Sequence, residues 1–86
     1  MILKSGVQYN KSEMKRYRLT DHAKKRMKER GISVRYLEST LSHPDIVQPS
    51  FGNRKILVKF VRNKRLEVVA VEEDKGIIIL TIYYAH

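Results

Sequence analysis

The stretch RKILVKFVRNKRLEVVAVEEDKGIIILTIYY, residues 54–84, contains three apolar runs separated by two short polar segments. In the first two runs the apolar side chains recur at every second position, which is the period of a β-strand with one buried face. The last run, residues 77–84, is apolar on both faces, as is typical of a strand in the middle of a sheet. Residues 63–64 and 74–76 have the polar character of hairpin turns. The stretch therefore predicts an antiparallel meander.

A helix is predicted upstream of this meander. Thr20 is a suitable N-cap, and Gly31 is the expected left-handed stop at the other end. Leu19, Ala23 and Met27 recur every four residues, so they form a narrow apolar stripe along one side of the helix. This stripe is expected to face the sheet.

A second helix follows directly. Ser33 is its expected N-cap, and Pro44 ends it because proline disfavours helical geometry at the preceding residue. Val34, Leu37 and Leu41 are expected to form its apolar face.

Short strands are also expected at residues 17–19 and 46–48. The order of elements predicts an α+β fold, in which two N-terminal helices pack on one face of a three- to four-stranded antiparallel sheet. This single domain is expected to span residues 16–86. Residues 1–15 have weak periodicity, so they are expected to be a loose N-terminal arm or a short extra element.

The charge of the chain is unevenly distributed. The 86 residues carry 18 Lys and Arg against 9 Asp and Glu, which gives a net charge of +9. Nine basic and three acidic residues lie within residues 11–30, whereas Lys75 is the one basic residue of residues 66–86. A concentrated positive field attracts polyanions, so nucleic acid is the leading expected partner and an acidic protein is the alternative.

Several classes of protein are excluded or disfavoured. The chain has no cysteine, which excludes disulfides and cysteine metal sites. Its longest apolar run is about half the length of a membrane helix. No signal-peptide pattern is present, so a cytoplasmic location without a membrane partner is expected. The three histidines, His22, His43 and His86, lack the spacing of metal ligands, and no cofactor-binding motif occurs; we therefore expect neither a metal nor a cofactor.

The first predicted helix also carries a row of polar side chains. His22, Arg26 and Arg30 are spaced four residues apart, so they form a ridge beside the apolar stripe. Lys24 and Lys28 lie on a more distant side. The spacing alone fits either a functional row or a solvated ridge with an incidental histidine.

A family resemblance bears on this choice. The chain contains the string His22-Ala-x-x-Arg26-Met-x-x-Arg30-Gly-Ile, then Arg54 at the start of a strand and Thr81-Ile-Tyr83 in the last strand. From residue 19 to residue 84 it resembles a small prokaryotic family of unknown function with the signature HAxxRMxxRGI. That family is similar in layout to the RelE, ParE and BrnT toxins of the barnase-like RNase fold group.

The resemblance implies a toxin of a toxin–antitoxin system that acts as an endoribonuclease on mRNA, free or on the ribosome, and that is held by an acidic antitoxin. Positions that match the family's helix motif, its strand-opening basic position and its last strand imply five catalytic residues. They are His22, Arg26, Arg30, Arg54 and Tyr83. The residues expected to bind RNA are Lys24, Lys25, Lys28, Lys55, Tyr84 and His86.

Metal-independent RNA cleavage needs an acid, a base and fixed cations, and these residues would supply them. His22 is of the residue type most often used as a general acid or base, and Arg26 and Arg30 suit bidentate phosphate binding. Tyr83 or Tyr84 would stack a base or donate a proton, but only one of an adjacent pair on a strand can avoid the core.

Two alternatives stay open: a non-catalytic RNA- or ribosome-binding protein, and an interaction module that targets a protein such as a topoisomerase.

Overall fold

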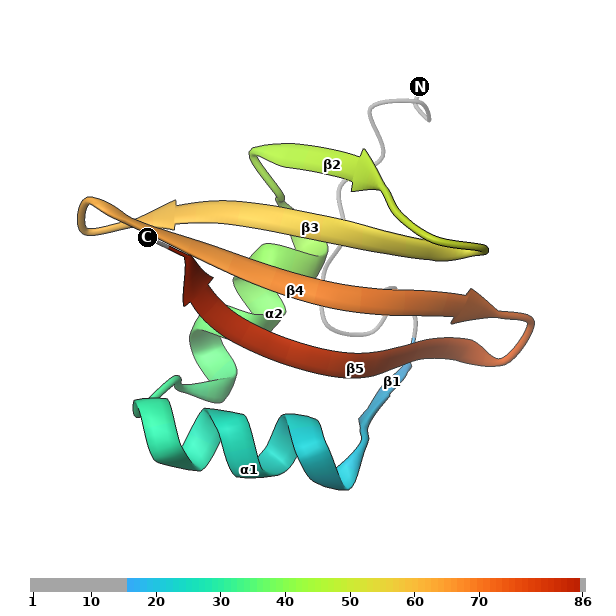
Figure 1. Ribbon diagram of the computed structural model, residues 1–86, viewed down its shortest axis with the longest axis horizontal. Helices are drawn as coiled ribbons and strands as arrows, with labels where there is room; N and C mark the ends of the chain where they lie inside the picture. The colour runs from blue at the N-terminus through green and yellow to red at the C-terminus, as the bar shows by residue number, and fades with distance from the viewer. Residues whose placement is uncertain (1–15, 86) are drawn as a thin grey trace.

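The structure is a computed structural model that describes residues 16–85. The arm expected at residues 1–15, and His86, lie outside the described residues. Two helices and five strands follow one another along the chain (Figure 1). Their order is β1 (Tyr17–Leu19), α1 (Asp21–Arg30), α2 (Val34–Ser42), β2 (Ile46–Pro49), β3 (Arg54–Val61), β4 (Lys64–Glu73) and β5 (Gly76–Ala85).

The sheet has five strands in the order β1-β5-β4-β3-β2, and it is mixed. Strands β2 to β5 form the expected antiparallel meander, and β5 lies inside the sheet between β1 and β4. The expectation of a purely antiparallel sheet of three to four strands is corrected by β1, which pairs with β5 in parallel. Strand β1 has three residues, too few for its sequence to show where or in which direction it pairs.

Helix α1 begins and ends at the predicted residues. The Thr20 side chain accepts a hydrogen bond from the backbone N–H of Ala23 at 3.1 Å, and Gly31 is left-handed with φ 64°. Thr20 also ties the helix to β5, because its hydroxyl donates to the Leu80 carbonyl at 2.9 Å and its N–H donates to the Ile79 carbonyl at 3.1 Å. In Figure 1, α1 runs beside β5.

Helix α2 is capped as expected, and Leu37 and Leu41 of its predicted apolar face pack in or against the core. The Ser33 side chain accepts from the Tyr36 N–H at 3.2 Å, and Leu37 is fully buried. Val34 is 52% exposed, so its predicted place in the apolar face is wrong. Ile32, which precedes the helix and is 5% exposed, fills the core at this end instead.

The main core lies on the face of the sheet that both helices cover. The pairing places Leu66, Val68 and Ala70 of β4 on that face. Between Val69 and Ala70 the register with β5 shifts by one residue, so Ile79 and Ile82 both reach the core although they are three positions apart. The helices and the segment between them contribute buried Ala23, Met27, Ile32 and Leu37.

The hairpin between β3 and β4 turns one residue earlier than expected. Arg62 and Asn63 have φ angles of 51° and 65°, so they form the turn, and Lys64 already belongs to β4. Two successive positive φ angles match the right-handed twist of the flanking strands. The turn therefore forms without a glycine.

Candidate functional site

Helix α1 carries the predicted polar ridge. His22, Arg26 and Arg30 are each one turn apart, so their Cα atoms follow one another at about 6 Å along the helix axis. His22 and Arg30 are exposed, and Arg26 is partly exposed. The guanidinium of Arg26 lies 3.8 Å from Glu29 Oε1, a weak surface ion pair. The structure thus brings three of the five predicted catalytic residues together on one helix.

Three of the four lysines expected to bind RNA lie on the same helix. Lys24, Lys25 and Lys28 are all exposed. Of the ion pairs formed among residues 16–85, one involves α1, the pair between Arg26 and Glu29. Most of the positive charge of this helix therefore faces solvent and can attract an anionic ligand.

Arg54 and Lys55 begin β3 and lie on opposite faces of the sheet. Arg54 pairs with Val71, on the face away from the helices, which we call the open face. Lys55 pairs with Ala70, on the helix side, and its Nζ lies 3.6 Å from Glu72 Oε1. The structure therefore places Arg54 apart from the ridge of α1.

Tyr83 and Tyr84 divide between the two faces, as expected for an adjacent pair. Tyr84 packs against the core on the helix side, with Lys64 Nζ 5.1 Å from the centre of its ring. Tyr83 lies on the open face opposite Glu67, and its hydroxyl donates to Glu67 Oε1 at 2.8 Å. Arg54 and Tyr83 therefore share the open face, on strands that flank β4.

Tyr83 belongs to a polar cluster that the sequence analysis missed. Arg65 Nε donates to Glu67 Oε2 at 2.6 Å, and the Arg65 guanidinium lies 5.9 Å from the ring centre of Phe60. Burial raises the pKa of Tyr83, and the Glu67 carboxylate raises it further, against a smaller opposite effect of Arg65. At neutral pH the Tyr83 hydroxyl therefore stays protonated and acts as a hydrogen-bond donor.

The signal for this cluster lies in the strand register. Arg65 and Glu67 occupy alternate positions of β4, so they share a face, and Glu67 lies directly across from Tyr83. The sequence shows the alternation, but it does not show which residue of β5 lies across from Glu67. Of the predicted RNA-binding residues, His86 lies outside the described part of the chain.

Two absences apply to residues 16–85. No group of three or more His, Cys, Asp or Glu residues in this range is arranged to hold a metal ion. No helix in it is both long and apolar enough to cross a membrane.

Comparison with known proteins identifies a family. Residues 19–84 match a family described as a domain of unknown function, DUF4258. No curated protein and no solved structure matches the chain.

Proposed function

We propose that this chain, which belongs to the DUF4258 family, is a metal-independent endoribonuclease of the toxin type that cleaves mRNA. The observation that carries the proposal is the ridge of His22, Arg26 and Arg30 on an exposed, strongly basic helix. The ridge combines an imidazole, the group most often used for acid–base catalysis, with two guanidinium groups suited to phosphate. The likeness in layout to the RelE, ParE and BrnT toxins is part of this proposal.

The proposed reaction uses the 2′-hydroxyl of the RNA as the nucleophile. His22 removes the 2′-OH proton, and the 2′-oxygen attacks the adjacent phosphorus. The bond from phosphorus to the 5′-oxygen breaks, and this oxygen takes up a proton from water as it leaves, while His22 returns its proton to the solvent. The products are a 2′,3′-cyclic phosphate and a 5′-hydroxyl end. Arg26 and Arg30 stabilise the extra negative charge of the pentavalent phosphorane.

The lysines of α1 would bind the RNA chain on either side of the cleaved bond, where they neutralise neighbouring phosphates. Arg54 and Tyr83 lie on the open face, away from the ridge, so the proposed reaction gives them no contact with the RNA. We further propose that cleavage occurs in the cytoplasm, on free or ribosome-bound mRNA, and that an acidic antitoxin-like protein inhibits it.

The test is RNA cleavage in the presence of EDTA with two variants and two matched controls. His22→Ala and Arg26→Ala should each reduce the cleavage rate by about a hundredfold, since they remove proton transfer or charge stabilisation. His43→Ala and Arg35→Ala replace exposed residues of the same types on or next to α2, so their rates should stay near that of the wild type. Equal rates for all five proteins would remove the proposed site.

One observation favours a second candidate, a non-catalytic RNA- or ribosome-binding protein. His22 makes no hydrogen bond with the other described residues, whereas a catalytic histidine is usually oriented by a second group. This candidate predicts salt-sensitive RNA binding without any cleavage product. A third candidate, a module that binds a protein such as a topoisomerase, predicts a protein complex that retains no RNA.

A further inference from the structure

The open face of the sheet is unusually apolar. An antiparallel sheet covered on one side normally places polar residues on the other side. Here the strand pairing places Ile56, Val69, Val71 and Ile78 together on the open face, and all four remain partly exposed. Phe60, on the same face, is 52% exposed. Within residues 16–85 the helices cover only the other face, and a contiguous apolar surface of this kind marks an interaction site.

Two arginines border this apolar surface. The pairing joins Arg18 to Ile78, Ile78 to Val71, and Val71 to Arg54, so one row crosses four strands with an arginine at each end. Three strand spacings separate the two arginines by about 14 Å along the row. Both are exposed, and neither forms an ion pair with another described residue.

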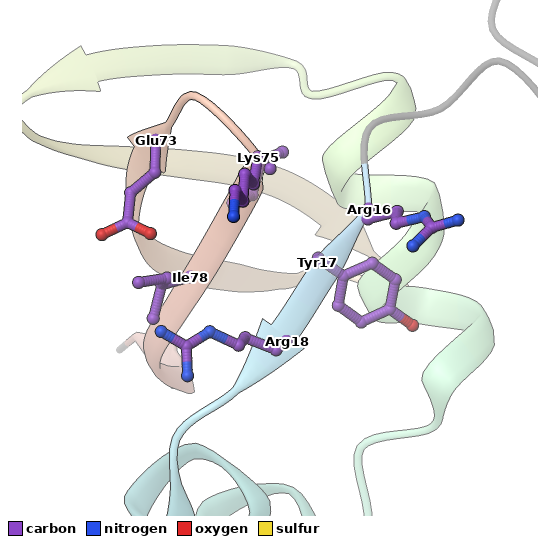
Figure 2. Close-up of a pocket in the computed structure, with 8 residues that line it drawn as sticks. Arg16, Tyr17, Arg18, Glu73, Lys75 and Ile78 are labelled. Carbon is purple, nitrogen blue, oxygen red and sulfur yellow. The ribbon is translucent and has the colours of Figure 1, made fainter.

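A hollow at one end of this row adds to the positive charge. It has a volume of about 280 Å³ and lies between β1 and the turn that joins β4 to β5 (Figure 2). In Figure 2 the Arg18 side chain points toward Ile78, on the side where Glu73 and Lys75 also lie. The lining contains three basic residues and one acidic residue; it comprises Arg16, Tyr17, Arg18, Glu73, Lys75, Gly76, Ile77 and Ile78. The border of the apolar surface therefore favours an anionic ligand group.

We propose that the open face binds an amphipathic segment of a partner protein. The apolar side chains of the segment cover Val69, Val71 and Ile78, and its carboxylates pair with Arg18 and Arg54. This docking surface goes beyond the proposed ribonuclease activity and stands whether or not the chain cleaves RNA.

The chemistry of the surface favours this occupant over two others. Its centre consists of aliphatic side chains, whereas single-stranded nucleic acid is bound by aromatic rings on which the bases stack. A second copy of the chain would bring its own Arg18 and Arg54 to the same surface, and two molecules of net charge +9 repel each other. An acidic amphipathic segment satisfies both the apolar centre and the basic border.

The probe is a fluorescein-labelled synthetic helical peptide with leucines on one side and glutamates on the other; a matched peptide carries lysines in place of the glutamates. Fluorescence anisotropy should detect binding of the acidic peptide only. The double variant Arg18→Gln/Arg54→Gln should weaken binding by about tenfold, since it removes two charge pairs. Arg35→Gln/Arg62→Gln, which loses the same charge elsewhere on the surface, should change it by less than about twofold.

A second variant tests the apolar part. Val71→Thr/Ile78→Thr keeps β-branched side chains in the sheet and should also weaken binding. In amide NMR spectra the peptide should shift the signals of β4 and β5 around Val69, Val71 and Ile78. The proposal is overturned if the acidic peptide fails to bind, if both charge variants weaken it equally, or if the shifts centre on α1. Displacement of the peptide by oligouridylate, or concentration-dependent self-association lost in the Thr variant, would assign the surface to RNA or to a second copy.

Discussion

Substitution of Gly76 by alanine tests how β1 is held in the sheet. Gly76 has a φ of 146°, which side chains rarely adopt, and a Cβ built on it would overlap the carbonyl oxygen of Arg16. That oxygen accepts the hydrogen bond from the Ile77 N–H at 2.8 Å, which starts the pairing of β1 with β5. An added methyl group must therefore push β1 away from β5 or twist the start of β5.

The cost follows from these two effects. A residue forced into an unfavourable backbone region costs about 1–3 kcal/mol, and a lost backbone hydrogen bond costs about 0.5–1.5 kcal/mol. Gly76→Ala should therefore lower the free energy of unfolding by about 2–4 kcal/mol. This is a large part of the 5–15 kcal/mol that is usual for a small domain.

Gly52→Ala is the matched control. Gly52 also has a positive φ, 61°, but a Cβ at this position meets nothing within 4 Å. Its substitution should cost only about 1 kcal/mol, the backbone contribution alone, so the two variants should differ by at least about 1 kcal/mol. Urea unfolding followed by circular dichroism measures both values. If Gly76→Ala falls within about 0.5 kcal/mol of Gly52→Ala, the close approach of β1 to this residue is refuted.

Three further predictions concern single side chains. The Tyr17 hydroxyl donates to Glu38 Oε2 at 2.9 Å, and burial is the main cause that raises the pKa of Tyr17 from 10.0 to about 12. As the pH rises from 10 to 12, the unfolded chain loses this proton before the folded protein does, so the free energy of unfolding of the wild type falls. Urea unfolding over this range should show a smaller fall for Tyr17→Phe, and an equal fall would contradict the raised pKa of Tyr17. Glu67→Gln removes the charge beside Tyr83 and should lower the pKa of that phenol, as followed by ultraviolet titration; an unchanged or higher pKa would exclude the contribution of Glu67. Lys28→Gln should reduce the slope of log K against log salt for single-stranded RNA by about 0.7, whereas an unchanged slope would mean that Lys28 contacts no phosphate.

Local signals in the sequence predicted the elements well. Thr20 and Gly31 delimit α1 as expected because a cap and a left-handed glycine act within a few residues of the chain. The alternation of apolar residues likewise predicted β3 and β4, and the continuous apolar run of residues 77–84 predicted β5. These features depend on neighbours in sequence, which a pattern can report.

Features that depend on pairing could not be predicted. The parallel contact of β1 with β5 joins residues about sixty positions apart, and the extra residue in β5 shifts its register with β4. The contacts of Glu67 with Tyr83 and Arg65 could not be predicted either, because they depend on the register of the strands. For the same reason the sequence did not show that the predicted catalytic residues lie in two places. Helix spacing fixes the α1 ridge, whereas the strand pairing places Arg54 and Tyr83 on the open face.

The most direct test of the proposed function is the digestion, in EDTA, of an RNA and of the same RNA with a single 2′-deoxynucleotide at the position of cleavage. Mass spectrometry then identifies the ends of the products. The proposed mechanism predicts that the all-ribose strand is cut to a 2′,3′-cyclic phosphate and a 5′-hydroxyl, and that the single missing 2′-hydroxyl blocks this cut. An intact all-ribose strand, or equal cleavage of both strands, would contradict it.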